Sequence, residues 1–189
     1  MTATLRRLAA CVLALATTAC AHDLAAPSHA ASIAGVDPVA LTGTAGMSIA
    51  HSPTFVVRGA DGAELAGVGV TVRVMSGGGS LTGAPTHSGI GPISVGAWTL
   101  GTTAGPNVLS VSAGGLPPLI ITALGLPDAP SQFLFVSGNA QEGSANSPLP
   151  QPIVLRVTDR FGNGVPNVDV SFTVARGEGV LSGKATAVS

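Results

Sequence analysis

The stretch Val168–Lys184, "VDVSFTVARGEGVLSGK", repeats the stretch Val68–Ala84, "VGVTVRVMSGGGSLTGA", and this repeat decides the fold. The two copies align without a gap, because each residue stands 100 positions from its counterpart. The same offset pairs Gly43 with Gly143, Ala45 with Ala145, Val57 with Val157 and Gly62 with Gly162. A fixed period of this kind indicates an array of like modules.

Both copies alternate between apolar and polar residues. In the second copy Val168, Val170 and Phe172 fall on one face of an extended chain and Asp169 on the other, and Val68–Val74 alternates in the same way. A period of two with one apolar face predicts a half-buried antiparallel strand. Further strands are predicted at Ser94–Gly101, Asn107–Gly114, Leu119–Leu124 and Ile153–Val157, with a turn at Thr158–Asn167. The predicted fold class is therefore all-β.

The length of the module and its short strands predict tandem immunoglobulin-like β-sandwiches, whose usual size is about 100 residues. We place the first unit at residues 31–126 and the second unit at residues 127–189. The second unit contains no counterpart of the first unit's strands from Ser94 to Leu124. We therefore expect the second sandwich to be incomplete and to leave an apolar face bare.

The glycine-rich end of the repeat resembles a phosphate-binding loop, because Gly183 is followed by Lys184. That loop requires glycine five positions earlier and serine or threonine after the lysine. Here those positions hold Glu178 and Ala185, and the first copy has Ala84 in place of the lysine. The shared glycines are therefore assigned to chain geometry, and no nucleotide or other cofactor is expected.

The composition excludes several classes of protein. Charged residues make up 9% of the chain, whereas about 25% is usual in a soluble domain. Aromatic residues make up 3% and the formal net charge is −1, with the basic residues scattered along the chain. A nucleic-acid partner is not expected, because it would require a clustered basic face and stacking aromatic residues.

The N-terminus has the pattern of a secretory signal peptide, predicted at residues 1–20. The basic pair Arg6–Arg7 precedes the apolar run Leu8–Ala19, which is too short for a comfortable transmembrane helix. Two cleavage sites compete. Lipoprotein-type cleavage would acylate Cys20, although Thr17 stands where leucine or valine is commoner, whereas ordinary cleavage after Ala21 would release a soluble product. We favour lipidation of Cys20, followed by a flexible tether at residues 21–30.

No catalytic or metal-binding residues are predicted. Cys11 and Cys20 are the only cysteines, so the exported chain has no internal disulfide and no cysteine-based zinc site. The four histidines, His22, His29, His51 and His87, show no metal-ligand spacing.

Three aspartates could suggest calcium, but Asp61, Asp159 and Asp169 are isolated from one another, and Asp159 is expected to cap a turn. No nucleophile elbow or acid–base pair is recognisable, and Trp98, the only tryptophan, is expected to pack in the core.

The stretches Val154–Gly183 and Gly96–Gly114 resemble the bacterial immunoglobulin-like domains of the invasin and intimin group. Members of this group show a strand, an aspartate and glycine-asparagine turn, and a second strand, with a Trp-Thr-Leu-Gly segment later. Gly164 stands where the group usually has proline, and the first unit keeps only Asp61 and Gly62 of the turn. The matching residues of the second unit are Asp159, Gly162, Asn163, Val165, Pro166, Val168, Val170 and Phe172.

The resemblance implies an exported, non-catalytic repeat protein that acts as a stalk or as an adhesive module. Its expected location is the outer membrane or cell surface, held through a lipid on Cys20, with secretion as the alternative. Its expected partner is a cell-surface protein or a glycan. A second interpretation makes these units the spacer of a longer secreted enzyme or glycan-binding protein, because such modules serve several functions.

Overall fold

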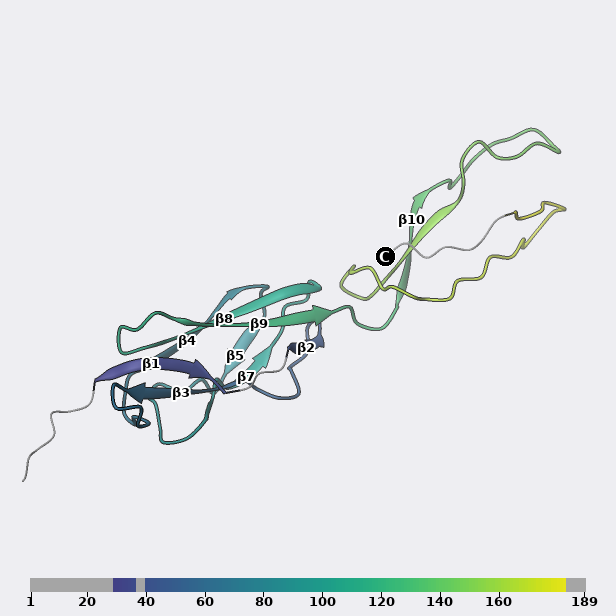
Figure 1. The fold of residues 1–189 in the computed structure, drawn as a ribbon. Coiled ribbons are helices and arrows are strands. Elements are labelled where there is room, and N and C mark those ends of the chain that lie inside the picture. Colours follow the sequence, from purple (N-terminus) through teal and green to yellow (C-terminus); the bar gives the residue numbers. More distant parts are fainter. Residues whose placement is uncertain (1–28, 37–39, 183–189) are drawn as a thin grey trace, which may run out of the picture.

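The computed structural model describes residues 29–36 and 40–182, and these residues form strands and turns with no helix (Figure 1). The predicted signal peptide, Cys20 and most of the predicted tether lie outside the described residues. The all-β prediction is confirmed for the described part of the chain, which also holds no helix that could cross a membrane. The strands are β1 (Ala30–Gly35), β2 (Leu41–Thr44), β3 (Thr54–Gly59), β4 (Val70–Ser76), β5 (Ser80–Thr82), β6 (Ile93–Ser94), β7 (Ala97–Thr99), β8 (Gly105–Ala113), β9 (Leu119–Leu126), β10 (Gln132–Ser137) and β11 (Val154–Thr158).

The first unit contains a sheet of strand order β2-β9-β8-β4, a second sheet of order β1-β3-β6 and the pair β5-β7. Neighbouring strands are antiparallel except β2 and β9, which run parallel. Side chains from both sheets and from the pair meet in one core. The buried members of this core are Ile49, Phe55, Val57, Val70, Val95, Trp98, Leu100, Leu109, Val111, Ala113 and Ala123.

Trp98 is the largest buried side chain of this core, with none of its surface exposed. The prediction that it packs inside the first unit is therefore confirmed. Its neighbours in sequence follow the expected alternation, because Ala97 is exposed and Thr99 is partly buried. The strand predicted at Ser94–Gly101 forms as two short pieces, β6 and β7.

The second unit contains the hairpin of β10 and β11, and its strand register repeats that of β1 and β3. Ile33 lies opposite Val57 in the first unit, and Phe133 lies opposite Val157 in the second. Both members of the pair have moved by the 100 positions of the sequence repeat. The period of the sequence repeat thus extends to the pairing of these strands, although β1 and β10 show little likeness in sequence.

The strand predicted at Val168–Val174 is wrong, because the described residues after Asn167 form no strand. Its side chains still alternate: Val168, Val170 and Phe172 are partly buried, and the residues between them are exposed. In the first unit the equivalent β4 is paired with β8 along its length. A strand needs such a neighbour to satisfy its N–H and C=O groups, and no described residue supplies one to Val168–Val174.

Among the glycines shared by the two copies, the first of the turn has the same backbone requirement in both units, whereas the next one does not. Gly77 and Gly177 both have φ +85°, in the left-handed region that favours glycine. Gly79 has φ +84°, and a side chain there would collide with the carbonyl of Thr99. Gly179 has no positive φ, so the two turns differ at their third residue, and Gly183 lies outside the described residues.

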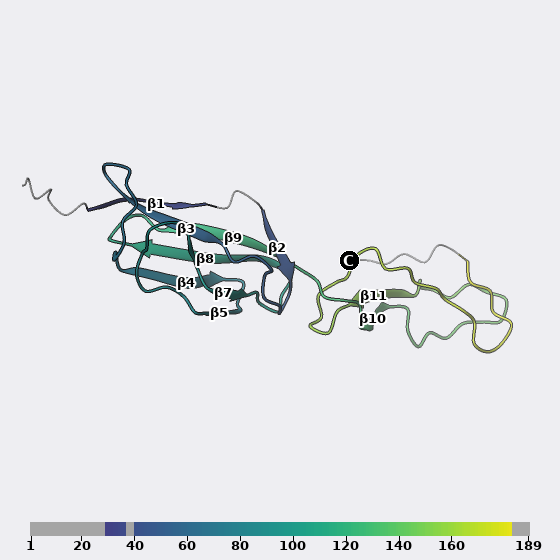
Figure 2. The same ribbon diagram turned by 90° about the horizontal axis from the view of Figure 1, so that it is seen from below.

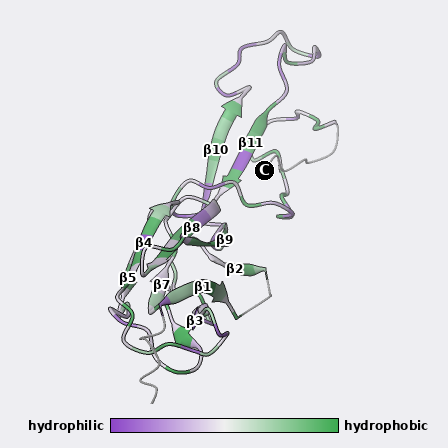
Figure 3. Ribbon diagram, turned by 60° about the vertical axis from the view of Figure 1, so that its left-hand side comes forward, coloured by the Kyte–Doolittle hydropathy of each residue, from purple (hydrophilic) through white to green (hydrophobic). Residues whose placement is uncertain are grey.

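An exposed apolar surface distinguishes the second unit from the first. Phe133, Leu134, Phe135 and Val136 on β10 are each more than half exposed. Figure 3 shows β10 coloured as a hydrophobic strand with no second layer over it. Ile33, the counterpart of Phe133 on β1, instead packs against the core of the first unit.

Candidate functional site

The described residues that were weighed as metal ligands are not brought together, and His22 lies outside the described residues. Among the described residues, no three His, Cys, Asp or Glu side chains are grouped as they would be around a metal ion. The ring of His87 pairs with the neighbouring Thr86 hydroxyl, at 3.1 Å. The Asp61 carboxylate accepts a hydrogen bond from the Ala63 N–H at 3.0 Å, and Asp169 is exposed. These side chains have structural or solvent-facing positions.

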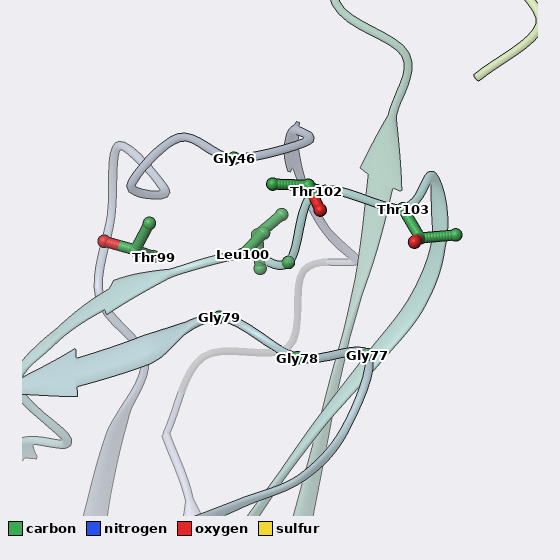
Figure 4. A pocket seen from close by; sticks show the side chains of 9 residues that line it. Gly46, Gly77, Gly78, Gly79, Thr99, Leu100, Thr102 and Thr103 are labelled. Atoms are coloured by element: carbon green, nitrogen blue, oxygen red, sulfur yellow. The ribbon is translucent and has the colours of Figure 1, made fainter. Parts of the chain in front are cut away.

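A hollow of about 600 Å³ opens at the end of the first unit that faces the second. Figure 4 shows it between the glycine turn Gly77–Gly79 and the segment Thr99–Thr103, with Gly46 at its rim. Its lining consists of backbone groups, threonine side chains and Leu100. This lining offers hydrogen bonds but no acid, base or cation, so it lacks the groups on which general acid–base catalysis depends.

Asp159 is the most heavily hydrogen-bonded side chain at the junction between the units. It is fully buried. Its Oδ1 accepts hydrogen bonds from the N–H groups of Phe161 at 2.8 Å and Asn163 at 2.9 Å. Its Oδ2 accepts from the Asp128 N–H at 2.9 Å and from Asn163 Nδ2 at 2.8 Å. The prediction that Asp159 caps the turn is confirmed, and the carboxylate also ties the turn to the linker, the segment at residues 127–131 between β9 and β10.

Two opposing effects set the pKa of Asp159. Burial alone would raise it, because a charged carboxylate loses solvation. Hydrogen bonds from the Asn163 side chain and from the N–H groups of Asp128, Asn163 and Phe161 stabilise the charged form. The donors prevail, and the pKa of Asp159 lies below its ordinary value.

We predict that the second unit is stable at neutral pH and loses stability in acid. A carboxylate with a depressed folded-state pKa contributes its full stabilisation above the unfolded-state pKa of about 3.9 and loses it as the pH falls through the lower folded value. Amide hydrogen exchange of β10 and β11 should therefore stay constant from about pH 7 to 5, after correction for the intrinsic rate, and accelerate below about pH 4. Asp159→Asn should remove most of this acid-dependent change. An equal pH dependence in Asp159→Asn would contradict the assignment.

Asn163 crosses from the second unit to the first. Its Oδ1 accepts a hydrogen bond from the Ala104 N–H at 2.9 Å, and its Nδ2 donates to the Thr102 carbonyl at 2.8 Å. One donor and one acceptor on the same amide thus meet their complements on a single loop, which fixes the orientation of the amide. The same Asn163 Nδ2 also donates to the Asp159 carboxylate, so Asp159 positions the amide that connects the two units.

Two further contacts complete the junction. The ring of Phe161 lies against Gly46, where a Cβ would stand 2.8 Å from Cζ of the ring. The Arg160 Nε pairs with the Asp128 carboxylate at 3.1 Å. The Arg160 guanidinium also lies 4.6 Å from the centre of the Phe161 ring, a distance at which a cation is attracted to the ring face. The side chains of the turn therefore contact both the linker and the first unit.

The loop that receives Asn163 is braced from inside the first unit. Asn107, on β8, is fully buried. Its Oδ1 accepts from the Gly101 N–H at 2.9 Å, and its Nδ2 donates to the Gly105 carbonyl at 3.1 Å. These bonds hold both ends of the loop between Gly101 and Gly105, so the loop that faces Asn163 is braced by contacts within the first unit itself.

Sequence reasoning found part of this site. It identified Asp159, Gly162 and Asn163 as a turn, because aspartate, glycine and asparagine recur in turns for known stereochemical reasons. It did not find the contact of Asn163 and Phe161 with the first unit. These contacts could have been suspected from the residues that differ between the two copies, because Asn163 and Phe161 stand where the first copy has Ala63 and Asp61.

Comparison of the chain with protein-family models, curated proteins and solved structures gives no match. The resemblance to the invasin and intimin group therefore depends on the residues quoted above.

Proposed function

We propose that the chain is an exported, surface-anchored repeat protein whose units form a stalk or an adhesive, non-catalytic module. The observation that carries this proposal is the junction, where Asn163 of the second unit hydrogen-bonds to Thr102 and Ala104 of the first. The units lie end to end in both views of the ribbon (Figures 1 and 2). Units connected in this way extend a chain and place contact loops at a distance from its anchor.

We further propose that the units are tandem immunoglobulin-like sandwiches of the invasin and intimin type, the second of them incomplete. Two observations support this interpretation. The hairpin β10–β11 repeats the register of β1 and β3. The apolar face of β10 is exposed, whereas the counterpart face of β1 is covered by the core of the first unit. Further strands equivalent to β7, β8 and β9 would cover that face.

The proposed anchor is a lipid on Cys20, at the end of the predicted signal peptide. The proposed location is the outer membrane or cell surface, and the proposed partner is a cell-surface protein or a glycan. Acyl chains on one cysteine can hold a protein at a membrane without a spanning helix. The low charge of the chain, 9%, supports a role without nucleic acid.

We expect an epitope tag placed after Ser189 to be accessible to antibody and protease on intact bacteria that express the full chain. Cys20→Ala should abolish labelling by a palmitate analogue and release the tag from the cell. Cys11→Ala is the matched control and should leave labelling and exposure unchanged, because Cys11 lies within the predicted signal peptide. Labelling that persists in Cys20→Ala, or a tag hidden inside the cell, would overturn the proposal.

A further inference from the structure

We propose that the turn Asp159–Asn163 is a docking element that binds the end of the preceding unit. Its side chains would then identify a unit that packs against the end of another. The end of the first unit that receives it is formed by Gly46 and the loop Thr102–Ala104. This inference concerns how units recognise each other, and it goes beyond the proposed role at the cell surface.

The first argument comes from the equivalent turn in the first unit, Gly59–Ala63. There the Gly59 N–H donates to the Ala63 carbonyl at 2.9 Å, and the Gly62 N–H donates to the Gly59 carbonyl at 3.0 Å. The turn Asp159–Asn163 makes the same two backbone bonds, at 2.9 Å and 3.1 Å. The two turns therefore share the same backbone hydrogen bonds.

The side chains of the two turns differ at the positions that form the junction. Gly59 stands for Asp159, Asp61 for Phe161 and Ala63 for Asn163. In the first unit the Asp61 carboxylate caps this turn by accepting from the Ala63 N–H, so the backbone conformation needs a carboxylate cap but not the particular side chains of the second unit. Their shared property is contact with the linker or with the preceding unit.

The receiving surface is complementary in shape and in hydrogen bonding. Gly46 has φ +74° and no side chain, which leaves room for the Phe161 ring. The Thr102 carbonyl and the Ala104 N–H present one acceptor and one donor to the Asn163 amide. The Gly46 N–H is itself bonded to the Gly101 carbonyl at 2.9 Å, so the two parts of this surface are joined.

The decisive experiment measures amide exchange of Ala104 by NMR in the full chain. Asn163→Ala removes the acceptor of the Ala104 N–H, and exchange should accelerate about tenfold, the equivalent of one net hydrogen bond. The Gly101 amide, which bonds to Asn107 within the first unit, should be unchanged. Asp61→Ala is the control variant, because it perturbs the equivalent turn away from the junction. Unchanged Ala104 exchange in Asn163→Ala would overturn the proposal.

A second readout reports the orientation of the units. Spin labels at Thr71 and Leu134, both exposed, with Cys11 and Cys20 replaced by serine, should give one narrow distance distribution. Asn163→Ala and Gly46→Ala should each broaden it, while Gly62→Ala should not, because a Cβ at Gly62 meets no atom within 4 Å. A distribution equally narrow in all variants would refute docking. Because neither readout involves export or lipidation, failure here is distinguishable from failure of the surface role.

Discussion

Asp159→Ala is expected to abolish the folded state of the second unit while leaving the first unit intact. The substitution removes the acceptor of four hydrogen bonds, three from backbone N–H groups and one from Asn163 Nδ2. Each bond to a charged acceptor is worth about 1.5–3 kcal/mol, and a buried donor left unpaired costs about 1–3 kcal/mol. The loss exceeds what an isolated two-stranded sheet can tolerate, because such a sheet is marginal in water.

Hydrogen exchange of the β10 and β11 amides measures this loss, and Trp98 fluorescence during thermal unfolding reports the first unit separately. In Asp159→Ala the second-unit amides should exchange at nearly unprotected rates, with the Trp98 transition unchanged. Asp159→Asn should be intermediate, because it keeps an acceptor oxygen and loses the charge. Asp61→Ala is the control from the equivalent turn. Retained protection of β10 and β11 in Asp159→Ala would show that the carboxylate is dispensable.

Gly79→Ala is expected to destabilise the first unit far more than Gly83→Ala. Both glycines have positive φ, +84° at Gly79 and +68° at Gly83, so both variants pay a left-handed backbone cost of about 1–2 kcal/mol. At Gly79 the new Cβ also collides with the Thr99 carbonyl and would stand 2.7 Å from the Leu100 carbonyl carbon. At Gly83 no atom lies within 4 Å of the Cβ position.

Urea unfolding monitored by Trp98 fluorescence checks this comparison. Gly83→Ala should lower the free energy of unfolding by about 1–2 kcal/mol, and Gly79→Ala by about 3 kcal/mol or more, because backbone atoms cannot rotate away as a side chain would. Both variants lose free energy of unfolding through the left-handed backbone, so the additional loss in Gly79→Ala measures the steric collision of the new Cβ. Equal losses would mean that the glycine turn moves to accommodate the methyl group.

The sequence predicted the strands of the first unit from β4 onward except β5, because alternation of apolar residues and glycine-marked turns act locally, and it did not predict β1, β2 or β3. The strands predicted at Val68–Val74 and Asn107–Gly114 correspond to β4 and β8. The strand at Val168–Val174 failed for a nonlocal reason, since alternation shows which face is apolar but cannot show whether a neighbouring strand exists. The bridging role of Asn163 was missed for a related reason, because its partners lie 61 and 59 residues away in the chain.

The attachments at the junction constrain how the chain can move there. One is covalent, through the segment at Asp128, whose N–H is held by Asp159. The others are the Asn163 amide on the loop Thr102–Ala104 and the Phe161 ring against Gly46. A single covalent tether would let the second unit swivel freely, whereas these additional contacts resist torsion about the long axis. A chain pulled from its ends would therefore keep its twist until the Asn163 amide and the Phe161 ring separate from the first unit.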